Sequence, residues 1–535
     1  MTVKIILAVL YLAVVFWLAF KGWRETRQAS DYMLAGRQMH PFVMAMSYGS
    51  TFISTSAIIG FGGAAGMFGF PLLWLTVLNI FVGVFIAFVF FGKRTRRMGV
   101  ALDAHTFPEL LGLRYQSRFV QGFAGLIIFL FIPIYAAAVL IGICRMIEVN
   151  LDINFTHALI GFTIILAVYV ITGGLKGVMY TEAFQGTLMF AMMLILVGFT
   201  YYSLGGVTEA HQALTDLAPY VPEKLKQGGM LGWTQGSEFG SPIWLVIYTT
   251  IVWGVGIGVL AQPQLAVRYM TVNSDRELNR AVLFGGVFIV AMTGIAFVVG
   301  ALSNVVFFND PASSGKIAIQ VADGNMDKII PIYVTDIMPD WFGVLFLLAM
   351  FAAAMSTLAS QYHAGGTSLG RDFYEKGMGV EVDDPLKVNR TTVGIIIIVT
   401  TIWAWILPPS IIAKATAFFF GLCAAAFLPC FFLGLYWKGV TRAGAIVSMV
   451  GGLFISAFYL LFVHSAESGP LGLSQAVFGV KSLALLAEPG SLLWKLQFVD
   501  PNIVALPISF GLAIVVSLAT SKLDQKHVDF CWKRF

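Results

Sequence analysis

Charged side chains are scarce in this sequence. Asp, Glu, Lys and Arg make up 11% of its 535 residues, whereas a typical soluble chain carries about 25%. Hydrophobic residues make up 58%, and the mean hydropathy is +0.84. This composition excludes a soluble globular protein, and a net charge of only +5 gives no reason to expect a nucleic-acid partner. We expect an all-α integral membrane protein whose surroundings are the lipid bilayer.

Several other classes of protein are disfavoured by what is missing. The four cysteines, Cys144, Cys423, Cys430 and Cys531, show no metal-ligand spacing and are expected to be reduced. The sequence contains no Walker or dinucleotide glycine pattern, so ATP is not the expected energy source. Its seven histidines form no local cluster with carboxylates, which argues against a membrane enzyme. The short tail after residue 521 argues against a signalling sensor.

Long apolar runs dominate the chain. A spanning helix needs about 20 mostly apolar residues, and by that rule we expect about 13 spans. They lie near 3–20, 42–66, 71–92, 118–147, 155–172, 182–204, 242–262, 280–308, 340–368, 391–408, 411–437, 442–463 and 503–521. Most of the 33 Lys and Arg residues fall in loops on one side of this arrangement. This bias predicts a multi-pass protein of the cell (inner) membrane, with the N-terminus outside and the C-terminus in the cytoplasm.

Two spans are rich in glycine and small hydroxyl residues. They are 47–69 in the second span and 251–263 in the seventh, five spans apart. Because five is odd, two five-helix units, spans 2–6 and 7–11, would be inverted relative to each other. Matched interrupted helices of this kind are typical of a midplane binding site in a secondary transporter. The alternative is that these glycines only allow close helix packing.

This pattern predicts a single transporter domain over 1–535, with one helix before the two repeats and two after them. Its expected parts are the first helix and cytoplasmic loop at 1–40, the first repeat at 41–204, the second repeat at 242–437, and the last two helices with the tail at 438–535.

A pair of hydroxyl residues interrupts the apolar run FAAAMSTLASQ at 351–361. Ser356 and Thr357 could each bond to a carbonyl one helical turn earlier and need no other partner. The interrupted second span offers another role, because an unwound turn exposes main-chain carbonyl oxygens. Adjacent helix residues point about 100° apart, so the two hydroxyls can converge on an ion held between them. Neutral oxygen ligands suit a monovalent, releasable cation, which we expect to be sodium.

Four stretches together give the chain a resemblance to the sodium/solute symporter family. They are DYMLAGRQM at 31–39, TGGLKGVMYTEAFQG at 172–186, AQPQLAVRYMTVNSDRELNRA at 261–281 and AAAMSTLASQ at 352–361. The resemblance implies the leucine-transporter type of fold and a sodium site. Its implied ligands are the carbonyls of Ser50, Ile53 and Ala353 and the hydroxyls of Ser356 and Thr357.

One position departs from the family's pattern. Where the family usually has Thr-Asp, this chain has Thr181-Glu182. The resemblance implies that this carboxylate couples to the route by which sodium leaves. The alternative is an acidic residue at a helix N-terminus that complements the helix dipole.

The stretches RYQSR at 114–118 and STSAIIGFGGAAG at 54–66 look closest to the pantothenate and monocarboxylate branch of the family. They suggest a small organic anion, for which the N-terminus of a half-helix is a natural seat. The candidate substrate-lining residues are Tyr48, Phe52, Ser54 and Ser56 on the second span, and Trp253, Val255 and Gly256 on the seventh.

The function hypothesis is therefore sodium-coupled import of a small carboxylate by alternating access, with no catalytic residues. Two alternatives stay open. One is a proline, amino-acid or sugar symporter that also uses sodium. The other is a proton-coupled carrier of the same fold, which would need a titratable group at the midplane; neither FAAAMSTLASQ nor the expected breaks contain one.

Overall fold

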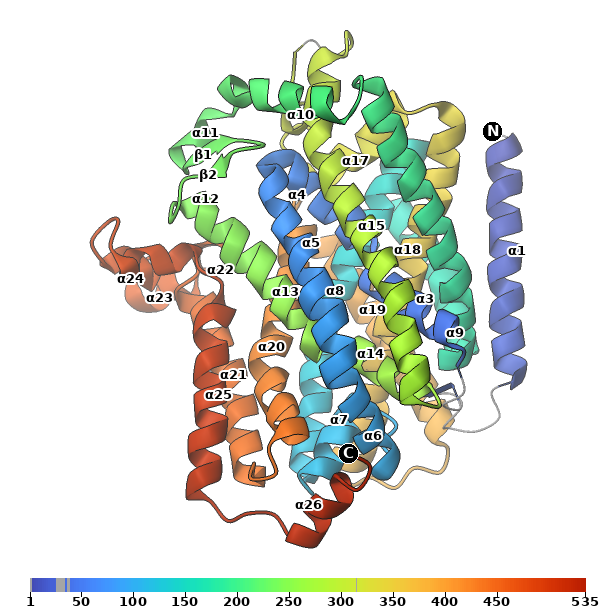
Figure 1. Cartoon of the computed structure of the whole chain (residues 1–535), viewed down its shortest axis with the longest axis vertical. Coiled ribbons are helices and arrows are strands. Elements are labelled where there is room, and N and C mark those ends of the chain that lie inside the picture. Colours follow the sequence, from blue (N-terminus) through green and yellow to red (C-terminus); the bar gives the residue numbers. More distant parts are fainter. Residues whose placement is uncertain (1, 26–33, 36–38, 314) are drawn as a thin grey trace.

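The structure is a computed structural model that describes residues 2–25, 34–35, 39–313 and 315–535. Most of the stretch at 31–39 therefore lies outside the described residues. Long helices run roughly along the longest axis, and the two chain ends lie at opposite ends of it (Figure 1). We call the end with α10 (Val207–Asp216) and the strands β1 (Met230–Gly232) and β2 (Gly236–Ser237) the outer end. The end with α7 (Phe107–Arg114) and α26 (Gln525–Cys531) is the inner end.

The long helical segments follow the predicted spans in chain order. They are α1 (Thr2–Glu25); α3 (Pro41–Phe52), η2 (Ser56–Gly60) and α4 (Phe61–Phe68); η3 (Phe70–Leu72), α5 (Leu73–Ile80), η4 (Phe81–Gly92) and α6 (Lys93–Ala101); α8 (Arg118–Leu151); α9 (Phe155–Ser203); α12 (Pro242–Leu245), η6 (Val246–Gly254), α13 (Val255–Gly258) and η7 (Val259–Ala261); α15 (Asp275–Asn309); α18 (Asp340–Thr367) and η11 (Ser368–Gly377); α19 (Pro385–Ile406); α20 (Ile412–Tyr436); α21 (Arg442–Phe462); and α25 (Pro501–Ala519).

Shorter elements connect these segments. They are η5 (Ala218–Tyr220), α11 (Glu223–Gln227), α14 (Pro263–Ala266), η8 (Val267–Thr271), α16 (Ala318–Val321), η9 (Met326–Lys328), α17 (Ile329–Ile332), η10 (Tyr333–Ile337), α22 (Ser465–Leu471), α23 (Leu473–Phe478), η12 (Leu483–Leu486), α24 (Leu492–Lys495) and η13 (Leu496–Phe498). The strands β1 and β2 pair antiparallel in an outer loop.

The helices confirm the expectation of an all-α membrane protein. Within the described residues, ten helical segments are long and apolar enough to cross a membrane, and the bent pair formed by α3 and η2–α4 makes eleven. The other two predicted spans fall on α1 and on the first part of α9, where Phe155–Val168 is a shorter apolar stretch. The count of thirteen and the inverted-repeat layout stay predictions.

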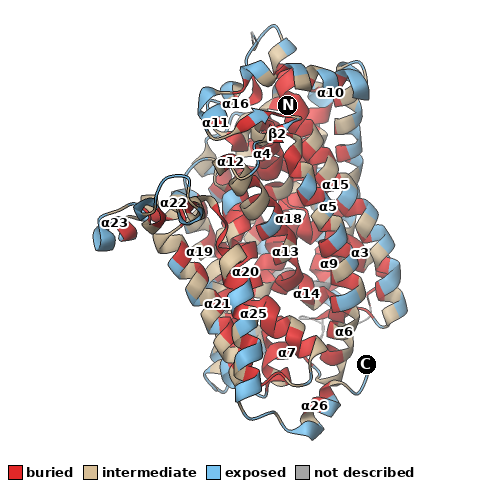
Figure 2. Cartoon of the chain, turned by 60° about the vertical axis from the view of Figure 1, so that its left-hand side comes forward, coloured by how far each residue is buried: buried red, intermediate tan, exposed pale blue. Residues whose placement is uncertain are grey.

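The helices differ in how far they are buried: some lie in the centre of the bundle and others at its periphery. The segments α18–η11 and α20 are mostly enclosed by neighbours, whereas α21 and α25 pack along each other and leave most of their residues partly or fully exposed (Figure 2). In a membrane protein such exposed apolar faces contact lipid. The site is therefore to be sought along α18 and α20, away from the lipid-facing pair.

Small residues allow the first broken helix to pack closely. A Cβ atom added to Gly300 of α15 would lie 2.0 Å from the carbonyl oxygen of Gly62 in α4. The outer end of α4 is fixed by side chains as well. The Trp233 indole N–H and the Asn304 amide donate to the Gly66 carbonyl at 2.9 and 2.8 Å. The outer loop that contains β1 and β2 is thus attached directly to the broken helix.

Candidate ion and substrate site

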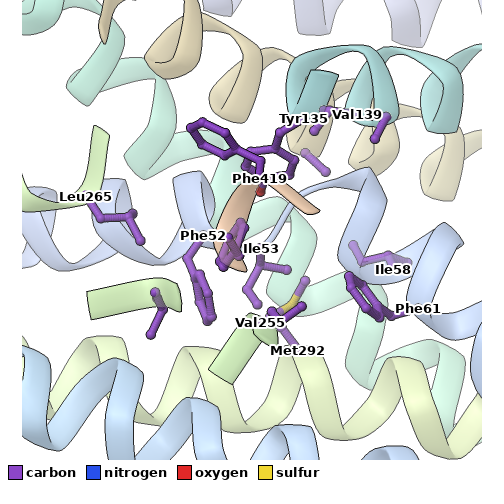
Figure 3. Packing of buried hydrophobic residues seen from close by; sticks show 14 of the residues in the cluster. Phe52, Ile53, Ile58, Phe61, Tyr135, Val139, Val255, Leu265, Met292 and Phe419 are labelled. Carbon is purple, nitrogen blue, oxygen red and sulfur yellow. The ribbon is translucent and has the colours of Figure 1, made fainter. Parts of the chain in front are cut away.

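The predicted interruption of the second span lies between α3 and η2. The two helical parts meet at 49°, and Ile53 has an extended backbone with φ −90° and ψ 101°. In a continuous helix the N–H of Ala57 would bond to the Ile53 carbonyl. Here the N–H groups of Ala57 and Ile58 both bond to Ser54, at 3.0 and 3.1 Å. The break thus leaves the Ile53 carbonyl without its usual helical donor, and Figure 3 shows Phe52 and Ile53 at this point, close to Val255.

The hydroxyl pair of α18 reaches the end of α3. Ser356 Oγ donates to the Ser50 carbonyl at 3.0 Å, and Thr357 Oγ1 lies 3.2 Å from the same oxygen. Thr357 Oγ1 also lies 3.3 Å from the Thr51 carbonyl. All four residues are at most 1% exposed. Four oxygen atoms from two helices therefore meet in a space closed to solvent.

The alternative role of the two hydroxyls is a hydrogen bond to a carbonyl one turn earlier in their own helix. One such bond is present, but it does not account for all the contacts of the pair. Ser356 Oγ lies 3.2 Å from the carbonyl of Ala353, one turn earlier. The same oxygen is closer to Ser50 on the neighbouring helix. The predicted ligands Ser50, Ala353, Ser356 and Thr357 are thus brought together by direct contacts, with Ile53 three residues further along the break. That they bind sodium stays a prediction.

A buried ion pair lies one helical turn further along α18. The carboxylate of Glu182 in α9 contacts the guanidinium of Arg268 in η8 at 2.9 Å, and their side chains are 0% and 1% exposed. Ser360 of α18 donates to Glu182 Oε1 at 2.5 Å, and Thr51 of α3 donates to the same atom at 3.0 Å. Ser47 of α3 contacts both members of the pair. Four elements, α3, α9, α18 and η8, meet at this cluster.

Thr51 belongs to both groups of contacts. Its carbonyl faces Thr357, and its hydroxyl donates to Glu182. The Thr51 hydroxyl also lies 3.1 Å from Ser360 Oγ. A shift of the α3 end relative to α18 would therefore change the hydroxyl pair and the ion pair together.

The structure corrects two expectations about charged residues. Glu182 lies in the interior of α9, so the alternative of an acidic residue at a helix N-terminus is wrong. Neither FAAAMSTLASQ nor the breaks contain the titratable group that the proton-coupled alternative needs, but Glu182 reaches this region from a different helix. Arg268 is one of the basic residues counted in the loops on one side, and it is expected there to face solvent; in η8 it is instead buried against Glu182. The sequence signal that could have identified Arg268 as a site residue is its position inside the family-like stretch at 261–281.

A small central cavity lies beside the break. It has a volume of about 20 Å³, which is room for about one water molecule. Three of the predicted substrate-lining residues line it, namely Phe52, Ser54 and Val255. The polar and aromatic residues that sequence reasoning missed are Phe61, Asn79, Tyr135, Thr293, Phe297, Thr416 and Phe420. An organic solute could enter this cavity only if its walls moved apart.

Four other predicted lining residues lie elsewhere. The Tyr48 hydroxyl donates to the Gly83 carbonyl at 2.9 Å and receives a bond from Tyr269. A Cβ atom on Gly256 would meet Leu78 at 2.8 Å. Trp253 is 40% exposed, and the buried Ser56 does not line the central cavity. The placement of these four therefore gives their predicted substrate role no support.

The first backbone N–H groups of the half-helix η2 already donate hydrogen bonds to Ser54. This affects the expectation that a solute carboxylate binds at the N-terminus of this half-helix. Ser54 accepts from Ser56 N–H through its side chain, and from Ala57 and Ile58 through its carbonyl. A solute carboxylate at this N-terminus would have to displace Ser54.

The second interrupted helix differs from the expectation in one detail. Its glycines lie in helical backbone, and the extended residue is Gln262, with φ −72° and ψ 117°, between η7 and α14. Gly254 packs against the carboxylate of Asp500, and Gly258 packs against the carbonyl of Phe420. These glycines therefore allow close approach, as the packing alternative held, and the break follows them.

The inner end below the ion pair is closed. Only about 20 Å³ of space remains between α7, α14 and α18, where Arg268, Ser360 and His363 form part of the wall. Arg371 contacts Glu109 at 2.7 Å across this region. Although burial raises the pKa of Glu109, hydrogen bonds from His105 and the charge of Arg371 lower it to about 2. Glu109 and Glu182 thus each pair with an arginine.

The outer end is open by comparison. A cavity of about 300 Å³ lies between α4, η6, α20 and the outer ends of α21 and α25. Along α4 the central cavity lies inward of it, since Phe61 lines the central cavity and Ala64, Met67 and Phe68 line the outer one. Among the described residues, little space thus remains between α7, α14 and α18, and a larger cavity lies beside α4, η6 and α20.

Comparison with known proteins is consistent with this geometry. Residues 32–452 match the model of the sodium:solute symporter family. A sodium/pantothenate symporter of Haemophilus influenzae is 29% identical over 452 residues, covering 83% of this chain and 88% of that protein. A sodium/proline symporter of Staphylococcus aureus is 27% identical over 492 residues, covering 89% and 88%.

A solved structure shares the fold. A Na⁺-coupled sialic acid symporter in a substrate-bound outward-open state superposes with a TM-score of 0.75 and 16% identity, covering 98% of both chains. The fold that the resemblance implied is therefore found in a solved sodium-coupled transporter.

Proposed function

This chain belongs to the sodium:solute symporter family, and on that basis we propose that it imports a small organic carboxylate together with sodium by alternating access. Sodium-coupled solute transport across a membrane follows from the family. The relatives carry pantothenate in one case and proline in another. The carboxylate, the ion ligands and the coupling route are the specific parts of the proposal.

One observation carries the ion site: Ser356 and Thr357 both contact the Ser50 carbonyl at the end of α3. The hydroxyl hydrogens now hold these oxygens together. A sodium ion would take over that role, with the hydroxyls turned so that their lone pairs face the ion. The Ala353 carbonyl and the freed Ile53 carbonyl would complete a shell of five oxygen atoms. Such a site is neutral, so it can release its ion.

The cluster around Glu182 and Arg268 links ion release to the inner gate. Sodium between α3 and α18 would hold Thr51 and Ser360 where they bind Glu182. Loss of sodium toward the inner end would loosen that contact and allow the ion pair to part. The pair is the inner closure in this scheme, and the membrane potential helps to drive the cycle, at about 2.3 kcal/mol per charge for each 100 mV.

The solute would bind in the central cavity beside the break. Phe52 and Phe420, whose ring centroids are 6.5 Å apart, would separate to admit it. Asn79 supplies a buried amide oxygen that has no hydrogen-bond partner among the described residues. It is therefore the polar group most available to a solute in this cavity.

Uptake into proteoliposomes tests the proposal. Vesicles containing the chain should accumulate [¹⁴C]pantothenate when an inward sodium gradient is imposed, and the double variant Ser356→Ala with Thr357→Ala should lose this uptake. The control is Thr187→Ala, since Thr187 is an exposed hydroxyl on α9 that bonds only to its own helix. Undiminished uptake by the double variant at normal sodium affinity would reject the ion site.

The two alternatives give different results in the same vesicles. Sodium-driven uptake of [¹⁴C]proline or a sugar, without pantothenate, would replace the carboxylate with another solute. Uptake driven by a pH gradient in sodium-free buffer would favour proton coupling, and Glu182 is the group that makes this second candidate worth testing.

A further inference from the structure

The loop between α21 and α25 exposes many large apolar side chains. We call residues 463–500, which contain α22, α23, η12, α24 and η13, the outer arm. Apolar side chains that are exposed together in one short segment mark a surface that contacts another molecule or lipid. Those of the outer arm are between 44% and 79% exposed, and they are Leu471, Leu473, Val477, Phe478, Leu485, Leu486, Leu492 and Leu493.

The interior of the outer arm contains small polar side chains. Ser468, Ser474 and Ser482 are all 0% exposed. The Ser468 hydroxyl donates to the Lys481 carbonyl at 2.8 Å, and the Ser482 hydroxyl donates to the Val463 carbonyl. A segment surrounded by water normally buries its leucines and exposes its serines. The reversed arrangement of the arm suits apolar surroundings.

The outer arm lies at the depth where the hydrocarbon core of the membrane ends. It joins α21 and α25, which are 21 and 19 residues long and apolar enough to span a membrane. At about 1.5 Å per residue, each helix is about as long as the hydrocarbon core is thick. From the outer ends of these helices the arm projects sideways beyond the bundle (Figure 1, Figure 2). It therefore extends over the lipid that surrounds α21 and α25.

The apolar surface of α21 continues into the outer arm. Phe454 and Phe458, one helical turn apart, are 68% and 41% exposed. The ring centroid of Phe458 lies 5.2 Å from that of Phe462, at the outer end of α21. The Phe462 centroid lies 5.6 Å from that of Phe478 in α23. Neighbouring aromatic side chains thus lead from the lipid-facing part of α21 to the exposed leucines of the arm.

Side-chain hydrogen bonds attach the outer arm to the bundle. The Tyr459 hydroxyl of α21 donates to the Leu496 carbonyl at 2.8 Å. Within the arm, the Ser465 hydroxyl of α22 donates to the Gln497 carbonyl at 3.3 Å. Ala466 in α22 also lines the outer cavity. A surface that binds the arm would therefore hold the outer end of α21 and one wall of that cavity.

We propose that the outer arm is an interfacial membrane anchor, which binds the phospholipid leaflet at the outer end of the bundle without crossing the membrane. Its exposed leucines, Val477 and Phe478 enter the boundary between headgroups and acyl chains, where amphipathic segments bury their apolar side chains by about 5–10 Å. Lipid binding by the arm needs neither the proposed ion site nor a particular solute.

Site-specific fluorescence tests this proposal. The full-length chain with Leu486→Cys is labelled with an NBD thiol reagent, since Leu486 is 66% exposed and the four native thiols are buried. The labelled protein is inserted into phosphatidylethanolamine and phosphatidylglycerol vesicles. Some of their lipids carry a doxyl quencher, either near the glycerol backbone or deep in the acyl chain. We expect the shallow quencher to act more strongly than the deep one, and aqueous iodide to have little effect.

Two further labelling positions provide the controls. Phe454→Cys, near the middle of α21, should be quenched most by the deep doxyl group. Gln235→Cys, in the exposed turn between β1 and β2, should be quenched by iodide and by neither lipid. A label on Leu486→Cys that behaves like the one on Gln235→Cys would overturn the proposal. A label shielded from both iodide and lipid would also overturn it, because a second copy of the chain or another protein would then cover the arm.

Charged substitutions on the outer arm give a second measurement. Leu473 and Val477 lie four residues apart on one face of α23, and both are exposed. Leu473→Asp with Val477→Asp should reduce the quenching of the Leu486→Cys label by the shallow doxyl lipid, toward the level of Gln235→Cys. The control, Leu473→Ile with Val477→Leu, should keep the quenching. Equal quenching in the charged and the apolar variants would contradict the anchor, provided that their melting temperatures show both to be folded.

Discussion

The guanidinium of Arg268 lies 2.9 Å from the carboxylate of Glu182, and both side chains are closed to solvent. The two residues are 86 positions apart in the chain. A buried charge pair of this kind adds little net stability, but an unpaired member is costly because it leaves a charge in a medium of low dielectric constant. In the mechanism that we propose, the pair belongs to a closed state, and opening of the inner end has to separate it or move it as a unit.

Removal of one member should be worse than removal of both. We expect Arg268→Gln to lower the free energy of unfolding by about 3–5 kcal/mol, because Glu182 is left with its charge uncompensated. Glu182→Gln should also destabilise, because it removes the negative charge that compensates Arg268 and replaces one of the two acceptor oxygens with an NH₂ donor. The double variant should recover most of the loss. Apparent melting temperatures of the purified proteins give the double-mutant cycle, and additive losses would show that the pair is not coupled.

The Thr357 hydroxyl should matter more than the shape of the side chain. Thr357→Val keeps the branched form but removes the oxygen next to Ser50 and Thr51, so the apparent sodium affinity in uptake should fall about tenfold. Thr357→Ser keeps the oxygen and should stay within a few-fold of the parent chain. Sodium titrations of uptake at fixed pantothenate compare the three proteins. Equal sodium affinities for the valine and serine variants would show that the oxygen is not a ligand.

Local sequence patterns were enough for the helices and for the hydroxyl pair. The apolar runs predict the spans because lipid demands about 20 such residues, and each predicted span falls on a helix. Ser356 and Thr357 stood out because two hydroxyls adjoin in an apolar run, and the small residues near Ser50 marked the break. These signals are short-range, so they can be read along the chain.

The ion pair and the cavities depend on contacts between distant segments. Arg268 is a basic residue after a proline-containing turn, which in sequence resembles an inner-loop residue. Only the packing of four elements shows that it lies against Glu182. In the same way, the predicted lining residues Phe52 and Val255 meet Asn79, Tyr135 and Thr416 through helices whose orientation no periodic pattern gives.

The pH dependence of stability should reveal the outer contact between η9 and α20. Burial raises the pKa of Asp327 to about 6, although N–H groups near Ile411 and the charge of Arg145 oppose that rise. A carboxyl group with a raised pKa in the folded state favours folding below its unfolded pKa of about 4. That contribution is lost as the pH rises through 6. The apparent melting temperature should therefore be higher at pH 5 than at pH 7.5.

An amide at this position should remove part of the pH effect. Asp327→Asn can still accept the Ile411 N–H, which now bonds to Asp327 Oδ2 at 3.1 Å, but it cannot ionise. Its melting temperature should exceed that of the parent chain at pH 7.5 and change less between pH 5 and 7.5. The exposed Asp323→Asn, four residues earlier, is the control. A steeper pH dependence in Asp327→Asn than in the parent chain would contradict this assignment.

Two glycines in different helices should respond in opposite ways to an added methyl group. A Cβ atom on Gly258 would lie 2.4 Å from the Phe420 carbonyl oxygen, and backbone atoms of α20 cannot move aside cheaply. Gly258→Ala should therefore push η7 away from α20, cost about 1–3 kcal/mol in unfolding free energy and reduce uptake. Gly511 in α25 has no atom within 4 Å of its Cβ position. Gly511→Ala should be neutral or stabilise by up to about 1 kcal/mol, as alanine favours a helix. Melting temperatures and uptake rates of both variants test this prediction. Equal effects of the two substitutions would mean that Gly258 is not required for the close approach to the α20 backbone.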